Sequence, residues 1–95
     1  MALLSDAEIE ERLGGLPEWE RAGAAIRRTF ECGDFVGSVN FVSDMVEPAE
    51  SMGHHPDLEI SWDKVTVTIS THSEGGLTKA DFELAAEIDA QYPND

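Results

Sequence analysis

The chain has 95 residues, of which 41% are hydrophobic and 27% are charged. This composition predicts one globular domain over residues 1–95, close to the smallest size that buries a useful core alone. Six basic against 20 acidic residues give a net charge of −14, which argues against nucleic-acid binding because that binding needs cations to neutralise phosphates. No stretch approaches the about 20 apolar residues of a membrane span, and no secretion signal opens the chain.

Cys32 is the only cysteine. It cannot form an internal disulfide, and a chain without disulfides fits a reducing cytoplasm. We expect it to be a small buried apolar residue. The acidic excess also suggests a salt-rich cytoplasm, because salt shortens the range of charge repulsion from about 10 Å at 0.1 M to about 3 Å at 1 M.

Residues 3–15 predict a helix whose start is encoded in the sequence. Ser5 is the expected N-cap, and Glu8 three residues later completes a capping box. Gly14 and Gly15 end the helix.

Residues 17–32 predict a β-hairpin. A small-residue break at 22–24 separates two extended runs. In the second run, Ile26, Arg28 and Phe30 share one face.

Residues 34–53 predict one long helix that packs on a sheet. Pro48 should kink its last turns, because proline removes a backbone donor. Glu50 lies at the edge of the apolar stripe. The stripe itself consists of Phe35, Val39, Val42, Val46 and Ala49.

Two strands joined at residues 63–64 follow, and a helix over 75–92 closes the chain. His72 is expected at the end of the second strand, on its polar side. Thr78 should cap the helix, with Asp81 at the box position and also on the apolar stripe. The expected inner positions are Leu58, Ile60, Trp62, Val65, Val67, Ile69, Leu77, Leu84, Ala85 and Ile88.

These elements predict an α+β fold of order α-β-β-α-β-β-α. The expected architecture is a four-stranded antiparallel sheet with three helices packed on one face. An edge strand of such a sheet invites pairing with a second subunit.

His54 and His55 stand side by side in a chain with only three histidines. Adjacent side chains diverge on a regular strand or helix, so they converge only where the backbone is irregular. Pro56 disfavours the helical region for the residue before it, which places the pair at a helix-to-strand corner. Together with Glu50, His72 and Asp81 they could form carboxylate–histidine pairs, which suit proton transfer near neutral pH.

The chain resembles the pterin-4a-carbinolamine dehydratase family over essentially its whole length. The resemblance lies in "LPEW", "DF", "AE...HHPDL", "W..V.V.I.TH" and "GGLT..DF.LA..ID". The family signature has an acid four residues before a double histidine and proline. An aromatic residue, a third histidine and an aspartate follow. The matching positions are Glu50, His54, His55, Pro56, Trp62, His72 and Asp81.

The resemblance implies dehydration of a 4a-hydroxytetrahydropterin to the quinonoid dihydropterin, without cofactor or metal, by a homodimer or homotetramer. It assigns proton transfer to His54 and His72, and substrate holding mainly to His55. Glu50 would orient and charge a histidine, and Asp81 would bind the pterin edge or tune His72. Pro56 would shape the corner and Trp62 would line the pocket, where an aromatic face suits a flat ring.

Two residues depart from the family pattern. Gly53 stands where a larger polar residue is usual, which suggests a looser corner, and Pro48 makes the placing of Glu50 less certain.

Other interpretations remain open from the sequence. Asp81 could act only as a helix cap and Trp62 could be core. Three histidines with Glu50 could bind zinc, although the spacing matches no zinc motif. The alternatives in function are a non-catalytic protein-interaction or assembly module of the same fold, and related pterin chemistry in folate or molybdenum-cofactor metabolism.

Overall fold

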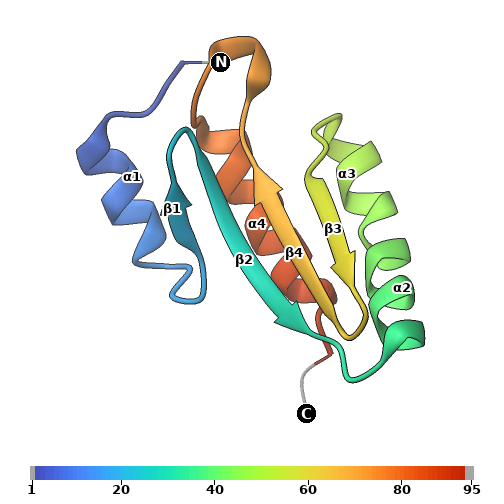
Figure 1. Cartoon of the computed structure of the whole chain (residues 1–95). Helices are drawn as coiled ribbons and strands as arrows, with labels where there is room; N and C mark the ends of the chain where they lie inside the picture. Colours follow the sequence, from blue (N-terminus) through green and yellow to red (C-terminus); the bar gives the residue numbers. More distant parts are fainter. Residues whose placement is uncertain (1, 94–95) are drawn as a thin grey trace.

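The structure is a computed structural model that describes residues 2–93 (Figure 1). Its four strands form one antiparallel sheet in the order β1-β2-β4-β3. The predicted α+β order is confirmed, with the second helix in two pieces. The elements are α1 Asp6–Leu13, β1 Glu20–Ala22, β2 Ala25–Glu31, α2 Phe35–Asp44, α3 Val46–Met52, β3 Asp57–Ser61, β4 Lys64–Ile69, the 3₁₀ turn η1 His72–Glu74 and α4 Lys79–Gln91.

The helices cover one face of the sheet, with α4 behind β2 and β4 and the α2–α3 pair beside β3 (Figure 1). Alternation along the strands produces this two-sided sheet, because successive side chains point to opposite faces. The core side consists of buried Ile26, Phe30, Val65, Val67 and Ile69, against Ile9, Phe41, Leu84 and Ile88 from the helices. None of the helices within residues 2–93 is long and apolar enough to cross a membrane.

Both predicted capping boxes are present. The Glu8 carboxylate accepts from the Ser5 backbone N–H at 2.8 Å, and the Ser5 hydroxyl accepts from the Glu8 N–H at 3.2 Å. At α4, the Asp81 carboxylate accepts from the Thr78 N–H at 2.8 Å. These local bonds fix where α1 and α4 begin.

The expected disruption near Pro48 is a break between α2 and α3. Met45 ends one helix and precedes the other. Pro48 is the third residue of α3, where a missing N–H costs nothing because the first turn has no intrahelical acceptor for it.

The predicted apolar stripe of the second helix is largely wrong. Phe35, Val39 and Val46 are 56%, 42% and 57% exposed, whereas Phe41 and Met45 are buried. This helix carries apolar residues of its own on all sides, so periodicity alone did not identify its inner face.

Contacts with the neighbouring turns select the inner face. The Ser38 hydroxyl donates to the Trp62 carbonyl at 2.7 Å. A Cβ at Gly37 would lie 2.3 Å from the Cys32 carbonyl oxygen, so glycine allows the close approach of α2. These two contacts turn Phe41 inward.

Candidate active site

The adjacent histidines lie at the predicted corner between α3 and β3. The helix ends at Gly53, whose φ of 61° lies in the left-handed region that glycine adopts without steric cost. Glycine is therefore the residue that favours this helix end, and the expectation that Gly53 loosens the corner stays a prediction.

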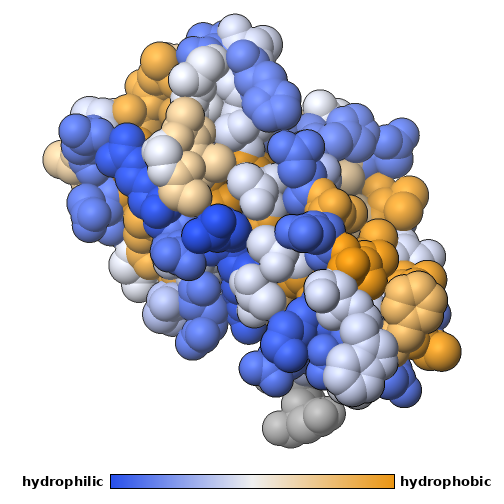
Figure 2. All heavy atoms as spheres, in the orientation of Figure 1, coloured by the Kyte–Doolittle hydropathy of each residue, from blue (hydrophilic) through white to orange (hydrophobic). Residues whose placement is uncertain are grey.

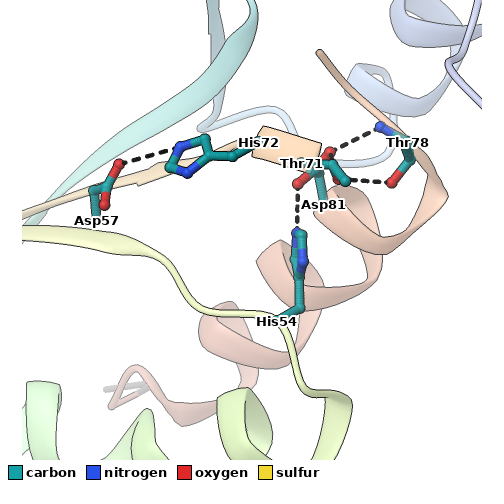
Figure 3. Close-up of polar contacts among 6 residues, drawn as sticks. All are labelled: His54, Asp57, Thr71, His72, Thr78 and Asp81. Carbon is teal, nitrogen blue, oxygen red and sulfur yellow. Dashed lines mark hydrogen bonds and ion pairs between the residues drawn. The ribbon is translucent and has the colours of Figure 1, made fainter. Parts of the chain in front are cut away.

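His54 turns toward the start of α4 and pairs with Asp81 (Figure 3). The distance from His54 Nε2 to Asp81 Oδ1 is 2.6 Å, with side-chain exposures of 15% and 0%. The Asp81 carboxylate is fully buried and bonds to His54, and its role toward a pterin or toward His72 stays a prediction.

Asp81 is surrounded by donors. Besides His54, the Thr71 hydroxyl donates to its Oδ2 at 2.8 Å and the Thr78 N–H donates to the same oxygen at 2.8 Å. The Thr71 and Thr78 hydroxyls also lie 2.8 Å apart, so Thr78 must donate to Thr71, whose own proton is directed at Asp81. Such a donor-only environment fits an ionised carboxylate, which accepts hydrogen bonds and donates none.

This environment selects one form of the neutral His54 ring. A ring nitrogen that bonds to an ionised carboxylate must carry the proton, so Nε2 is N–H and Nδ1 is the acceptor. Nδ1 has no hydrogen-bond partner among residues 2–93, and no buried polar side-chain atom in that range lacks one. Nδ1 is therefore open to solvent and to a ligand.

His72 lies one residue after Thr71, in the 3₁₀ turn η1 instead of at a strand end. The turn forms because Gly75 has a φ of 73° and a bridge pairs Thr71 with Gly76. His72 is 75% exposed, and its Nε2 lies 3.8 Å from Asp57 Oδ2 (Figure 3). Asp57 is two residues from His55, so the third histidine is close to the adjacent pair.

His55 turns away from His54 and bonds to Glu50 on α3. Its Nε2 lies 2.6 Å from Glu50 Oε2, and both side chains are well exposed. The two histidines therefore do not share a partner. His55 and Glu50 instead line an apolar groove of about 200 Å³, together with Val42, Met45, Val46, Ala49, Pro56 and Leu58.

Trp62 lies at the far end of β3 from the histidines. It is 69% exposed and is the only non-glycine residue of positive φ (53°) within residues 2–93. Five strand residues separate it from the corner, about 16 Å at 3.3 Å per residue. Trp62 therefore does not line the His54 site of its own chain.

Two polar neighbours had no role in the sequence interpretation, namely Asp57 and Thr71. Both are adjacent to motif residues, at "PD" and "TH". The only sign of them in the sequence was a polar residue close to each histidine. The residue that Thr71 contacts could not be read from the sequence, because it depends on where α4 begins.

A larger cavity of about 550 Å³ lies at the other end of the sheet. It contains no predicted site residue; its lining includes Glu31, Cys32, Asp44, Asp63 and Tyr92. Across residues 2–93 no group of three or more His, Cys, Asp or Glu side chains is arranged to hold a metal ion.

The fold and the site together define a small α+β protein with histidine–carboxylate pairs at a helix-to-strand corner. Residues 2–91 match the family model described as pterin 4 alpha carbinolamine dehydratase. The chain belongs to this family.

Relatives and solved structures agree with that assignment. A protein of Roseiflexus castenholzii, provisionally named a pterin-4-alpha-carbinolamine dehydratase, is 56% identical over 93% of this chain and 95% of its own. A similarly named protein of Mycobacteroides abscessus is 47% identical over 96% and 97%. The crystal structure of a transcriptional coactivator/pterin dehydratase from Brucella melitensis superposes with a TM-score of 0.91, at 32% identity over 97% of this chain and all of that one.

A more distant structure shares only the fold. It is a pterin dehydratase-like protein identified as a RuBisCO assembly factor in the alpha-carboxysome, with a TM-score of 0.64 and 19% identity over 81% of this chain.

Proposed function

We propose that this protein dehydrates a 4a-hydroxytetrahydropterin to the quinonoid dihydropterin. The observation that carries the proposal is the 2.6 Å contact between His54 Nε2 and the buried Asp81 carboxylate. An ionised Asp81 holds the Nε2–H form of the ring and leaves Nδ1 as a proton acceptor. A scaffold needs no such oriented base, whereas a dehydratase does.

The reaction removes one proton and one hydroxyl group from the substrate. His54 Nδ1 takes the proton from ring N5, the C4a–O bond breaks, and a C4a=N5 double bond forms. The departing hydroxyl takes a proton and leaves as water, so atoms and charge balance. One positioned acid or base contributes about 10²–10⁴-fold to such a step.

We assign protonation of the leaving hydroxyl to His72. It is exposed enough to reach a ligand, and Asp57 lies beside it to stabilise the charged ring. His55, bonded to Glu50, would hold the flat ring from the groove side, and Pro56 shapes that wall. Asp81 acts through His54 as a positioning residue.

The proposal also covers the cellular location, the assembly and the cofactor requirement of the protein. We expect a cytoplasmic homo-oligomer that recycles pterin and needs neither metal nor cofactor. The free edge of β3 supports the oligomer, since an uncovered edge strand favours pairing with another chain.

A stopped-flow assay of 4a-hydroxytetrahydropterin dehydration in about 1 M KCl tests the proposal. We expect activity in the wild type and losses of about 10²–10⁴-fold in His54→Ala and in His72→Ala. Glu18→Gln, a distant surface change, is the matched control. An inactive wild type would favour the assembly-module alternative, which the RuBisCO assembly factor illustrates for the same fold.

A further inference from the structure

The loop between β4 and α4 carries three groups of the candidate site. The Thr71 hydroxyl and the Thr78 N–H both donate to Asp81 Oδ2, and His72 lies between these two residues in the chain. Residues 72–75 form the exposed tip of the loop, so the tip has no buried side chain of its own to anchor it. The geometry of the site therefore depends on what holds the arm of the loop that returns to α4.

The N-terminal segment, residues 2–4, lies along this returning arm. Its Leu4 N–H donates to the Leu77 carbonyl at 2.9 Å, and Leu77 is 3% exposed. A Cβ at Gly76 would lie 3.0 Å from the Leu3 side chain, so the two stretches are in contact. Figure 1 shows the blue start of the chain running up to the orange loop, and Figure 2 shows a hydrophobic patch over this segment beside the hydrophilic loop.

A single peptide group joins this contact to the site. The Leu77 carbonyl and the Thr78 N–H belong to the same planar trans peptide unit, in which they point in opposite directions. The oxygen accepts from the Leu4 N–H, and the N–H donates to Asp81 Oδ2 at 2.8 Å. Asp81 Oδ1 in turn lies 2.6 Å from His54 Nε2. A chain of hydrogen bonds therefore runs from the Leu4 N–H through one peptide and one carboxylate to the His54 ring.

Such a chain is stronger than its separate bonds. A hydrogen bond accepted at the peptide oxygen polarises the peptide and strengthens donation by its N–H, by about 10–30% per bond. The carbonyl also needs a partner for its own sake, because Leu77 is buried. The Leu4 N–H meets both needs, since it satisfies the carbonyl and fixes the plane of the peptide that faces Asp81.

We infer that Leu4 is a positioning residue, whose backbone N–H holds the Thr78 donor against Asp81 and so maintains the Nε2–H form of His54. Two features fix the position of this N–H. The Leu4 side chain packs against the core, and the capping box that follows at Ser5 sets the start of α1. The influence on the ring stands on the geometry alone, while its effect on the reaction rate rests on the proposed function.

Exchange of one atom tests the inference. An ester in place of the peptide bond before Leu4 replaces the N–H by oxygen and keeps every side chain. The native Cys32 permits assembly of this full-length chain, by ligation of a synthetic segment 1–31 to residues 32–95. The matched control is an ester before Leu3, whose N–H makes no hydrogen bond within residues 2–93.

The Leu4 ester should exchange the Thr78 amide proton faster and should move the ¹⁵N spectrum of the His54 ring toward a mixture of ring forms. We expect kcat to fall about 2- to 10-fold, the effect of one hydrogen bond, with KM nearly unchanged. The Leu3 ester should match the wild type in all three measurements. A wild-type ring spectrum in the Leu4 ester, or equal changes in both esters, would overturn the inference.

Two substitutions repeat the test in expressed protein. Leu4→Pro and Leu4→Ala both remove the leucine side chain, but only proline also removes the N–H. We expect the His54 ring spectrum to change in Leu4→Pro and to stay close to that of the wild type in Leu4→Ala. Equal spectra in the two variants would overturn the role of the N–H. If the proline variant does not fold, the ester pair decides.

The inference and the proposed function fail in different ways. An inactive wild type would contradict the proposed dehydration, whereas ring spectra and amide exchange need no substrate and still decide on the chain of hydrogen bonds. Unchanged ring spectra in an active Leu4 ester would overturn the inference and leave the proposed function intact.

Discussion

His54 Nε2 and Asp81 Oδ1 lie 2.6 Å apart, and the Asp81 side chain is completely buried. The pair joins the corner after α3 to the first turn of α4. A residue that caps a helix thereby also sets the orientation of an imidazole, so the capping role and the site role of Asp81 coexist.

Thr71 allows this orientation to be tested without touching the substrate. Thr71→Val removes a donor to Asp81 Oδ2, and we expect kcat to fall roughly 10- to 100-fold with KM nearly unchanged. Thr71→Ser keeps the hydroxyl and should stay close to the wild type. ¹⁵N spectra of the His54 ring should show Nε2–H in the wild type and a mixture of ring forms in the valine variant. Identical spectra for both would contradict the positioning role.

Two phenylalanines of α2 test the observed inner face. Phe41 is 2% exposed and contacts Phe30, whereas Phe35 is 56% exposed. Phe41→Ala should lower the free energy of unfolding by about 3–5 kcal/mol. Phe35→Ala should change it by about 0.5 kcal/mol or less at low protein concentration. Urea unfolding measures both free energies. Equal losses in the two variants would contradict the assignment of Phe41 to the inner face of α2.

Cys32 predicts a pH dependence above neutrality. Burial raises the pKa of its thiol, and the Asp63 carboxylate acts in the same direction. The folded chain therefore keeps this proton to higher pH than the unfolded chain. The associated stability is complete below the pKa of the unfolded thiol, about 8.5, and declines as pH rises above it. Thermal unfolding from pH 7 to pH 10 should show a smaller decline in Cys32→Ser, and alkylation at pH 8 should be slower than in urea.

The acidic surface predicts a salt requirement. With 20 acidic and six basic residues, self-repulsion opposes the compact state and salt screens it. We expect Tm to rise between about 0.1 M and about 3 M KCl. An unchanged Tm in KCl would remove the hypothesis of a salt-rich cytoplasm.

Local signals in the sequence were sufficient for most of the fold. Capping residues, strand alternation and the glycine pair predicted the element order, because each depends on neighbours within a few residues. The inner face of α2 could not be predicted from the sequence, because it depends on contacts of Ser38 and Gly37 with turns that are distant in the chain.

The site was predictable as a set of residues but not as a set of pairs. The motif spacing identified His54, His72 and Asp81, yet the partner of Asp81 depends on how α4 meets the corner. Trp62 shows the same limit, because its place at the far end of β3 from the histidines depends on how the whole strand is laid down.

The most direct measurement is the response of the three histidine ring signals to a stable pterin. Titration with 7,8-dihydropterin, followed by ¹H–¹³C NMR, should shift the signals of His54, His55 and His72 together and to saturation, while the indole signal of buried Trp19 stays in place. Unmoved histidine signals, or a saturable shift confined to residues around Cys32 and Tyr92, would contradict a pterin site at the corner.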